Sequence, residues 1–99
     1  MDIAELTEKM HDFVRSKGFY EDKTPRRQTS RNLAISLVLE SSEVLEHFQW
    51  SEELKDPQEF AAELADVALY LLQLASVNNI DLEKAILDKL AFNKDRHWS

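Results

Sequence analysis

Cysteine is absent from this 99-residue chain, and glycine occurs once and proline twice. Without cysteine, the chain can form neither a disulfide framework nor a thiolate zinc site. Sheet-rich folds need glycine and proline at many turns, so the scarcity of both residues favours helices. The composition and the length together predict one all-α domain that comprises residues 1–99.

Long apolar runs and an excess of positive charge are also missing. The most apolar stretch, residues 64–77, contains Asp66 and Gln73 and is too short to span a bilayer. The first residues are acidic, and no signal-peptide core follows them. A net charge of −7 argues against broad binding to nucleic acid, which needs a positive surface. We therefore expect a soluble, cytoplasmic protein that binds neither membranes nor nucleic acid.

Apolar residues recur at helical spacing in four segments. These segments span approximately residues 2–16, 30–48, 57–77 and 82–93. The third has the clearest start, because Asp56 is a capping acid and Pro57 occupies the first helical position. Short connections between amphipathic helices favour antiparallel neighbours, so we expect a four-helix-type bundle. A chain this short leaves much of its surface exposed, which favours an oligomer formed through the apolar third segment.

The connector between the first two segments, residues 18–30, is basic because it contains Lys23, Arg26 and Arg27. Most basic loops are solvated, and we expect this of Arg26 and Arg27. A lid over a phosphate-bearing ligand is the alternative.

Two of the expected helices carry polar side chains on one face. In the second expected helix these side chains are spaced four, three and four residues apart, and they are Ser36, Glu40, Glu43 and His47. In the third expected helix they are spaced three, four and three residues apart, and they are Glu63, Asp66, Tyr70 and Gln73. Such spacings place each set along one helical stripe. The residues around Glu63 and Asp66 are apolar almost all round the helix, which predicts burial. Buried carboxylates are paired or bind metals.

The acids of the two stripes would converge if the two helices pack side by side. Grouped carboxylates repel one another unless a divalent cation neutralises them. Hard oxygen ligands suit Mg²⁺, with Mn²⁺ as an alternative. The predicted metal ligands and catalytic residues are Glu40, Glu43, Glu63 and Asp66. A di-iron centre is disfavoured, because His47 follows Glu43 by four residues and not by the three of a Glu-x-x-His motif.

At these residues the chain resembles the all-α nucleoside triphosphate pyrophosphatases of the MazG type, and most closely their dCTP-pyrophosphatase-like branch. The resemblance covers residues 13–98 and is strongest over residues 31–34, 39–50 and 63–67. The family pattern has two adjacent glutamates, a third three residues later, and a distant Glu-x-x-Asp. The chain departs from it at Leu39, where the family has the first glutamate, and so offers one carboxylate fewer.

The resemblance implies Mg²⁺-dependent hydrolysis of a (deoxy)nucleoside triphosphate between its α- and β-phosphates, in a house-cleaning or pool-balancing role. It implies phosphate binding by a further set of residues, Arg31, Lys89, Asn93 and Arg96. It also implies a base pocket built from His47, Trp50 and Tyr70. A homodimer or homotetramer is expected, in which a second chain completes the pocket.

Two alternatives stay open on the sequence. Phosphoribosyl-ATP pyrophosphohydrolase belongs to the same broad superfamily, although the Arg-Asn-Leu and Phe-Gln-Trp stretches favour the dCTP-pyrophosphatase-like branch. A non-catalytic helical interaction module is the alternative of another class, since single Glu-x-x-Glu pairs on exposed helices commonly have no function. Only convergence of the carboxylates and a response to Mg²⁺ distinguish the module from an enzyme.

Overall fold

The computed structural model describes residues 1–96, in which four α-helices follow one another and no strand is present. The helices are α1 (Ile3–Ser16), α2 (Ser30–Glu46), α3 (Pro57–Val77) and α4 (Leu82–Asp95). The expected all-α class is confirmed, and the expected helix ends differ from these by two residues or fewer. Trp98, the last residue of the resembling stretch, lies outside the described residues.

Each helix begins where a side chain accepts a hydrogen bond from a backbone N–H of the first turn. The accepting residues are Asp2, Thr29, Asp56 and Asp81, at 2.8–3.2 Å. Such caps satisfy amides that have no partner within the helix, and each stabilises it by about 1 kcal/mol. The capping residues, more than the apolar pattern, therefore set where these helices start.

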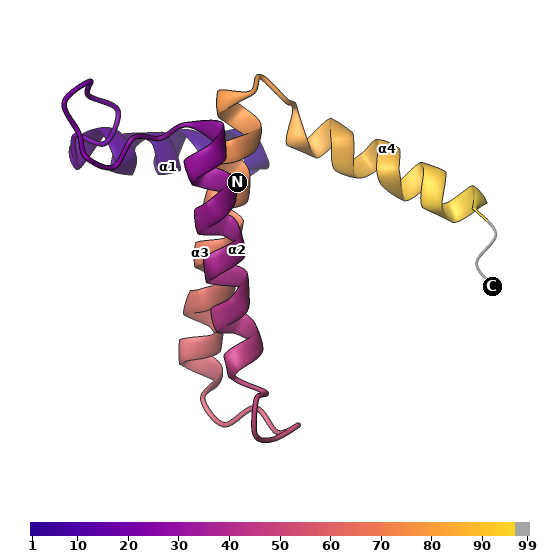
Figure 1. Ribbon diagram of the computed structural model, residues 1–99. Helices are drawn as coiled ribbons and strands as arrows, with labels where there is room; N and C mark the ends of the chain where they lie inside the picture. The colour runs from indigo at the N-terminus through magenta and orange to yellow at the C-terminus, as the bar shows by residue number, and fades with distance from the viewer. Residues whose placement is uncertain (97–99) are drawn as a thin grey trace.

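The core lies where three of the helices meet. α2 and α3 run antiparallel and side by side, and α1 crosses the pair near the end where α2 begins and α3 finishes (Figure 1). The buried apolar side chains are Met10 and Val14 of α1, Leu33 of α2 and Ala75 of α3. Gln73 of α3 is the one buried polar residue among those described.

α4 does not join this core. It projects away from the α2–α3 pair after a turn at Asn79, whose φ is 58° (Figure 1). None of its residues is buried, and its apolar residues Leu87 and Leu90 are each 60% exposed. The radius of gyration is 16.0 Å, against about 13 Å for a compact chain of this length. The helices therefore do not close into a bundle within one chain, because the apolar stripe of α4 has no surface of its own chain to cover it.

α3 is long for a helix of so small a protein. Among the described residues it is the one helix long and apolar enough to cross a membrane, judged by length and composition alone. Its 21 residues exceed the apolar stretch considered in the sequence, and 11% of its apolar window is buried inside the chain. Two acids, Glu63 and Asp66, lie in its middle, where a bilayer would tolerate them poorly.

Candidate functional site

The four predicted carboxylates come from the two helices that pack most closely together, α2 and α3. Glu40, Glu43 and Glu63 are half-buried, whereas Asp66 is exposed. Each pair is three residues apart on its helix, which keeps both members on the same face. The antiparallel pairing then places the two pairs at a similar height along the α2–α3 pair.

The other three predicted carboxylates all affect the pKa of Glu40. Its partial burial, followed by the negative charges of Glu43 and Asp66, raises its pKa above the usual value for glutamate. A hydrogen bond with Glu43 and the charge of Glu63 act in the same direction. The cause is that a carboxylate loses stability when water is removed and like charges approach. The charges of Glu43, Glu63 and Asp66 therefore all act on Glu40, and the predicted convergence of the four acids on one metal stays a prediction.

Glu63 has a partner that the sequence did not indicate. Its Oε2 pairs with Nε2 of His47, the residue that caps the C-terminus of α2. The His47 ring also meets the ring of Phe60 edge-on, with centroids 5.3 Å apart. His47 thus holds a carboxylate in place, and the structure does not set it against an open base pocket.

The acids lie near one another without forming a closed ligand cage. Within residues 1–96, no three side chains of His, Asp or Glu are gathered closely enough to hold a metal ion as they stand. Their donor chemistry nevertheless suits a hard divalent cation, since all four offer carboxylate oxygens. The raised pKa of Glu40 reflects its partial burial and the negative charges around it, which a bound cation would offset. The residues therefore fit a divalent metal by chemistry and by electrostatic need.

A cavity of about 580 Å³ opens beside Asp66, between α1, α2, α3 and the connector. Its apolar wall comes from α1 and the connector, through Leu6, Met10, Phe13 and Phe19. Its polar lining comes mainly from the connector, α2 and α3, through Gln28, Asn32, Ser36, Asp66, Tyr70 and Gln73. Apolar walls with a few convergent polar groups are typical of small-molecule sites, and the volume suits a nucleoside-sized ligand.

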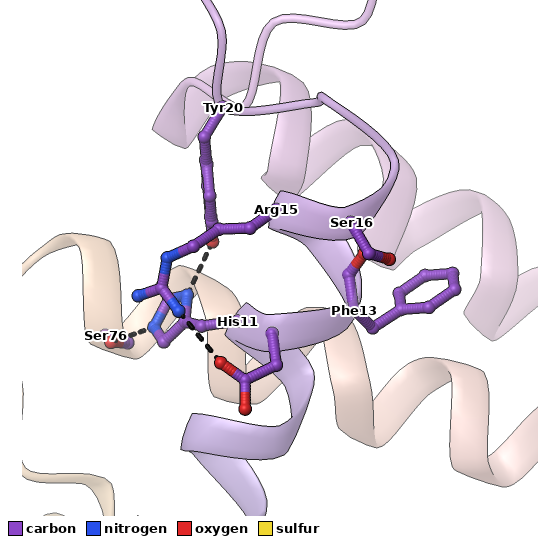
Figure 2. A network of polar contacts seen from close by, with 7 residues as sticks. His11, Phe13, Arg15, Ser16, Tyr20 and Ser76 are labelled. Atoms are coloured by element: carbon purple, nitrogen blue, oxygen red, sulfur yellow. Dashed lines mark hydrogen bonds and ion pairs between the residues drawn. The ribbon is translucent and has the colours of Figure 1, made fainter.

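Hydrogen bonds fix the connector to the helices behind this cavity. The imidazole of His11 lies between the hydroxyls of Tyr20 and Ser76, with Nδ1 to Oη at 2.6 Å and Nε2 to Oγ at 2.7 Å (Figure 2). Burial raises the pKa of Tyr20, so its phenol stays neutral. On the cavity side of the same network, Gln73 donates to the Tyr20 hydroxyl. The connector wall of the cavity is therefore attached to α1 and α3.

Arg26 and Arg27, which we expected to be solvated, are exposed but also line the cavity. The Arg26 guanidinium lies 5.7 Å from the centroid of the Phe19 ring. Arg27 Nη1 donates to the backbone carbonyl of Asp22 at 3.3 Å. Both arginines therefore lie beside the cavity, and the alternative of a lid over a phosphate-bearing ligand stays a prediction.

The remaining predicted residues fall in three different places. Tyr70 lines the cavity, as the base-pocket prediction requires. Trp50 is 88% exposed in the loop after α2 and does not line the cavity. Arg31 borders a shallow apolar hollow on the outside of α2.

The α4 residues Lys89, Asn93 and Arg96 lie on or at the end of the helix that projects away from the acids (Figure 1). Lys89 places its Nζ 4.8 Å from the centroid of the Phe92 ring of the same helix. Asn93 is half-buried, and both Asn93 and Arg96 have interaction partners within the chain. The structure of a single chain therefore does not bring the α4 residues to the acids.

Sequence reasoning missed most of the cavity lining. The spacing of Gln73 places it on the same helical stripe as Glu63 and Asp66, but no function was predicted for it. Phe13 and Phe19 showed no signal beyond their apolar character. Asn32 lies in the Arg-Asn-Leu stretch and also went unassigned. Only the crossing of α1 over α2 and α3 brings these residues together.

The sequence and the fold of this chain resemble those of known proteins. Residues 28–98 match the model of the MazG nucleotide pyrophosphohydrolase domain. The dCTP pyrophosphatase 1 of Homo sapiens is 40% identical over 76 residues, which cover 68% of this chain, and that of Rattus norvegicus is 38% identical over the same length. The chain spans 45% of the length of these relatives. A pyrophosphatase from Archaeoglobus fulgidus superposes with a TM-score of 0.77 at 29% identity, covering 98% of this chain and 93% of that one.

Proposed function

This chain belongs to the MazG nucleotide pyrophosphohydrolase family, and from that premise we propose that it hydrolyses (deoxy)nucleoside triphosphates between the α- and β-phosphates. The products would be a nucleoside monophosphate and pyrophosphate. The observation that carries the proposal is that the charges of Glu43, Glu63 and Asp66 all act on Glu40 across α2 and α3, beside a cavity of nucleoside size that Asp66 lines. We assign the protein a house-cleaning or pool-balancing role toward deoxynucleotides in the cytoplasm.

The carboxylates are the proposed metal ligands. MazG-like pyrophosphatases generally depend on a divalent metal, and hard oxygen donors favour Mg²⁺, with Mn²⁺ as the alternative. Glu40, Glu43, Glu63 and Asp66 would hold the ion. When bound, it would neutralise charge on the phosphates and lower the pKa of the attacking water.

Other roles in the proposed reaction fall to side chains of this site. One of the glutamates accepts the proton of the attacking water on a carboxylate oxygen. His47 keeps Glu63 in position through its contact from Nε2 to Oε2. Tyr70 and the apolar wall formed by Phe13 and Phe19 enclose the base, which keeps bulk water away from that end of the substrate.

A second copy of the chain supplies the phosphate-binding side chains that one copy keeps at a distance. The chain exposes 7949 Å² of surface, whereas a compact monomer of 11.5 kDa exposes about 5,800 Å². The excess is larger than the roughly 800 Å² per partner of a standard interface. We propose a homodimer or homotetramer in which α4 of one protomer brings Lys89, Asn93 and Arg96 toward the acids of its partner. Arg31, on the outer face of α2, would meet the same phosphates or the interface.

The test is hydrolysis of a panel of nucleoside and deoxynucleoside triphosphates with Mg²⁺, with pyrophosphate separated from orthophosphate. Wild type is compared with Glu63→Gln and Asp66→Asn, and with Glu46→Gln as a matched control, since Glu46 is an exposed acid of α2. Pyrophosphate release that Glu63→Gln and Asp66→Asn abolish and Glu46→Gln preserves supports the proposal. Folded wild-type protein that releases pyrophosphate from no nucleotide refutes it.

A further inference from the structure

Gln73 is a polar side chain in a position where the chain otherwise places apolar ones. It is 3% exposed and lines the cavity. It follows Asp66 by seven residues on the same stripe of α3, which places it about 10 Å further along the helix axis. That separation is comparable to the length of a nucleoside. A buried carboxamide needs hydrogen-bond partners, so its partners determine what it offers to a ligand.

The hydrogen-bond network fixes which way this carboxamide points. Nε2 of Gln28 donates to the backbone carbonyl of Arg26 at 2.6 Å, which turns Oε1 of Gln28 toward Gln73. Nε2 of Gln73 donates to that oxygen at 2.7 Å and to the Tyr20 hydroxyl at 3.2 Å. The reversed orientation would place two carbonyl oxygens against each other. Both amide hydrogens of Gln73 are therefore used within the protein.

The Tyr20 hydroxyl can take this role because it has a second partner. It accepts from Gln73, which leaves its own hydrogen for Nδ1 of His11; in that tautomer of His11, Nε2 carries the hydrogen and donates to Ser76 (Figure 2). In this series of hydrogen bonds each donor faces an acceptor, so the bonds have one consistent set of directions from Ser76 to the Arg26 carbonyl. The network leaves Gln73 one unused function, the acceptor oxygen Oε1.

Oε1 of Gln73 faces the cavity. Within residues 1–96, it accepts no hydrogen bond, yet it is not among the fully enclosed unpaired atoms. Because Gln73 is almost wholly buried and lines the cavity, the accessible part of its oxygen opens into that space. A ligand reaching this depth therefore meets a fixed hydrogen-bond acceptor.

We propose that Gln73 is a specificity-determining residue, whose Oε1 accepts a hydrogen bond from the exocyclic amino group of the nucleobase. The proposal rests on the proposed function, which puts the phosphates near Asp66 and the far edge of the base near Gln73. Cytosine and adenine carry an amino group at that edge, whereas uracil and hypoxanthine carry an oxo group. An oxo group would place two acceptors in contact, so the site selects amino-bearing bases over their oxo counterparts.

The experiment measures binding of the product nucleotides by calorimetry, in two pairs that exchange the amino group for an oxo group, dCMP with dUMP and dAMP with dIMP. Wild type should bind each amino member about tenfold more tightly than its oxo counterpart. Gln73→Leu, and Gln73→Met should Leu not fold, should bring the two affinities of each pair together. Tyr20→Phe is the matched control, because Gln28 still orients Gln73, and this variant should keep the preference.

Each outcome decides the proposal. A preference that is absent in wild type, or unchanged in both Gln73 variants, overturns it, as does a failure of wild type to bind either pair. Loss of the preference in Tyr20→Phe as in Gln73→Leu would reduce Gln73 to a packing role. Hydrolysis of triphosphates is measured separately. Discrimination without hydrolysis would remove the proposed function alone, and hydrolysis without discrimination would remove the role of Gln73 alone.

Discussion

Glu40 is a residue whose charge the fold disfavours. Its raised pKa means that the ionised carboxylate is less stable in the folded chain than in the unfolded one, where neither burial nor the charges of Glu43 and Asp66 act on it. At neutral pH, ionisation of Glu40 therefore lowers the stability of the folded chain. The same negative potential would attract the divalent cation of the proposed function.

We expect Glu40→Gln to stabilise the metal-free protein and to abolish hydrolysis. The neutral amide removes the repulsion at pH 7, so the melting temperature in EDTA should rise by about 1–3 °C, a small change because the group is partly solvated. Glu46→Gln, at an exposed acid of the same helix, should leave the melting temperature unchanged. A Glu40→Gln protein that melts at or below wild type would contradict this electrostatic account.

We propose that His47 acts on catalysis through Glu63 and does not contact the base. His47→Ala should lower kcat/KM about 10- to 100-fold, the usual effect of removing a partner that orients a ligand carboxylate. Because His47 lies against Glu63 and Phe60, the loss should be equal for every nucleotide. The measurement is kcat/KM for a pyrimidine and a purine triphosphate. A change in base preference would instead indicate that His47 belongs to the base pocket.

At the scale of elements, the connector depends on how α1 ends. Gly18 follows α1 with a φ of +72°, a left-handed conformation that a side chain disfavours. A Cβ at this position would also lie 3.3 Å from Oε2 of Glu21. The connector that starts here carries Phe19, Tyr20 and Gln28, so the geometry of one glycine sets the wall of the cavity.

Gly18→Ala should therefore destabilise the fold by about 1 kcal/mol, or roughly 4–8 °C in melting temperature. Asn79 supplies the matched comparison, because it also adopts a positive φ, of 58°, after α3. Asn79→Gly relieves that conformation and should leave the melting temperature unchanged or higher. Thermal unfolding monitored by circular dichroism measures both variants. Equal destabilisation by the two changes would contradict the backbone argument.

At the scale of the whole molecule, the chain is open where a bundle should be closed. Val38 of α2 is 67% exposed and Leu90 of α4 is 60% exposed. Apolar surface of this extent normally lies in an interface. Among residues 1–96, α3 is the one helix with the length and composition of a membrane-crossing helix, and it carries Glu63 and Asp66 in its middle.

The double variant Val38→Glu with Leu90→Glu should dissociate the proposed oligomer, since each glutamate would be buried unpaired in the proposed interface. Sedimentation or light scattering should show a smaller mass, with activity lost at the same time. Ala4→Glu adds the same charge at an exposed position of α1 and should change neither. A wild-type protein that is an active monomer would refute the shared site.

Mixing two inactive variants tests whether α4 acts in the partner's site. Lys89→Ala and Asp66→Asn chains, unfolded together and refolded, should form mixed dimers with one intact site each. Random pairing predicts roughly one quarter of wild-type activity, because half of the dimers are mixed and each carries one working site. The separately refolded variants are the control. Activity that never exceeds that of the separate variants would place Lys89 in the site of its own chain.

The sequence by itself determined the helices and the acid stripes. Capping residues and 3.6-residue periodicity are local, so the starts at Asp56 and Asp81 and the pairing of Glu63 with Asp66 on one face could be predicted without a fold. The family pattern over residues 31–34, 39–50 and 63–67 then indicated the chemistry, because its residues are consecutive or separated by fixed spacing.

The tertiary structure decided what lies beside the acids. His47 follows Glu43 along α2 but meets Glu63 across the helix pair, and Gln73 gains its orientation from Gln28 and Tyr20, some 45 and 53 residues earlier. The direction of α4 likewise depends on the turn that precedes it and on the lack of a surface of its own chain against which it could pack. No local sequence pattern encodes either of these. Periodicity specifies which face of a helix is polar, but the partner of that face is set by packing between segments distant in sequence.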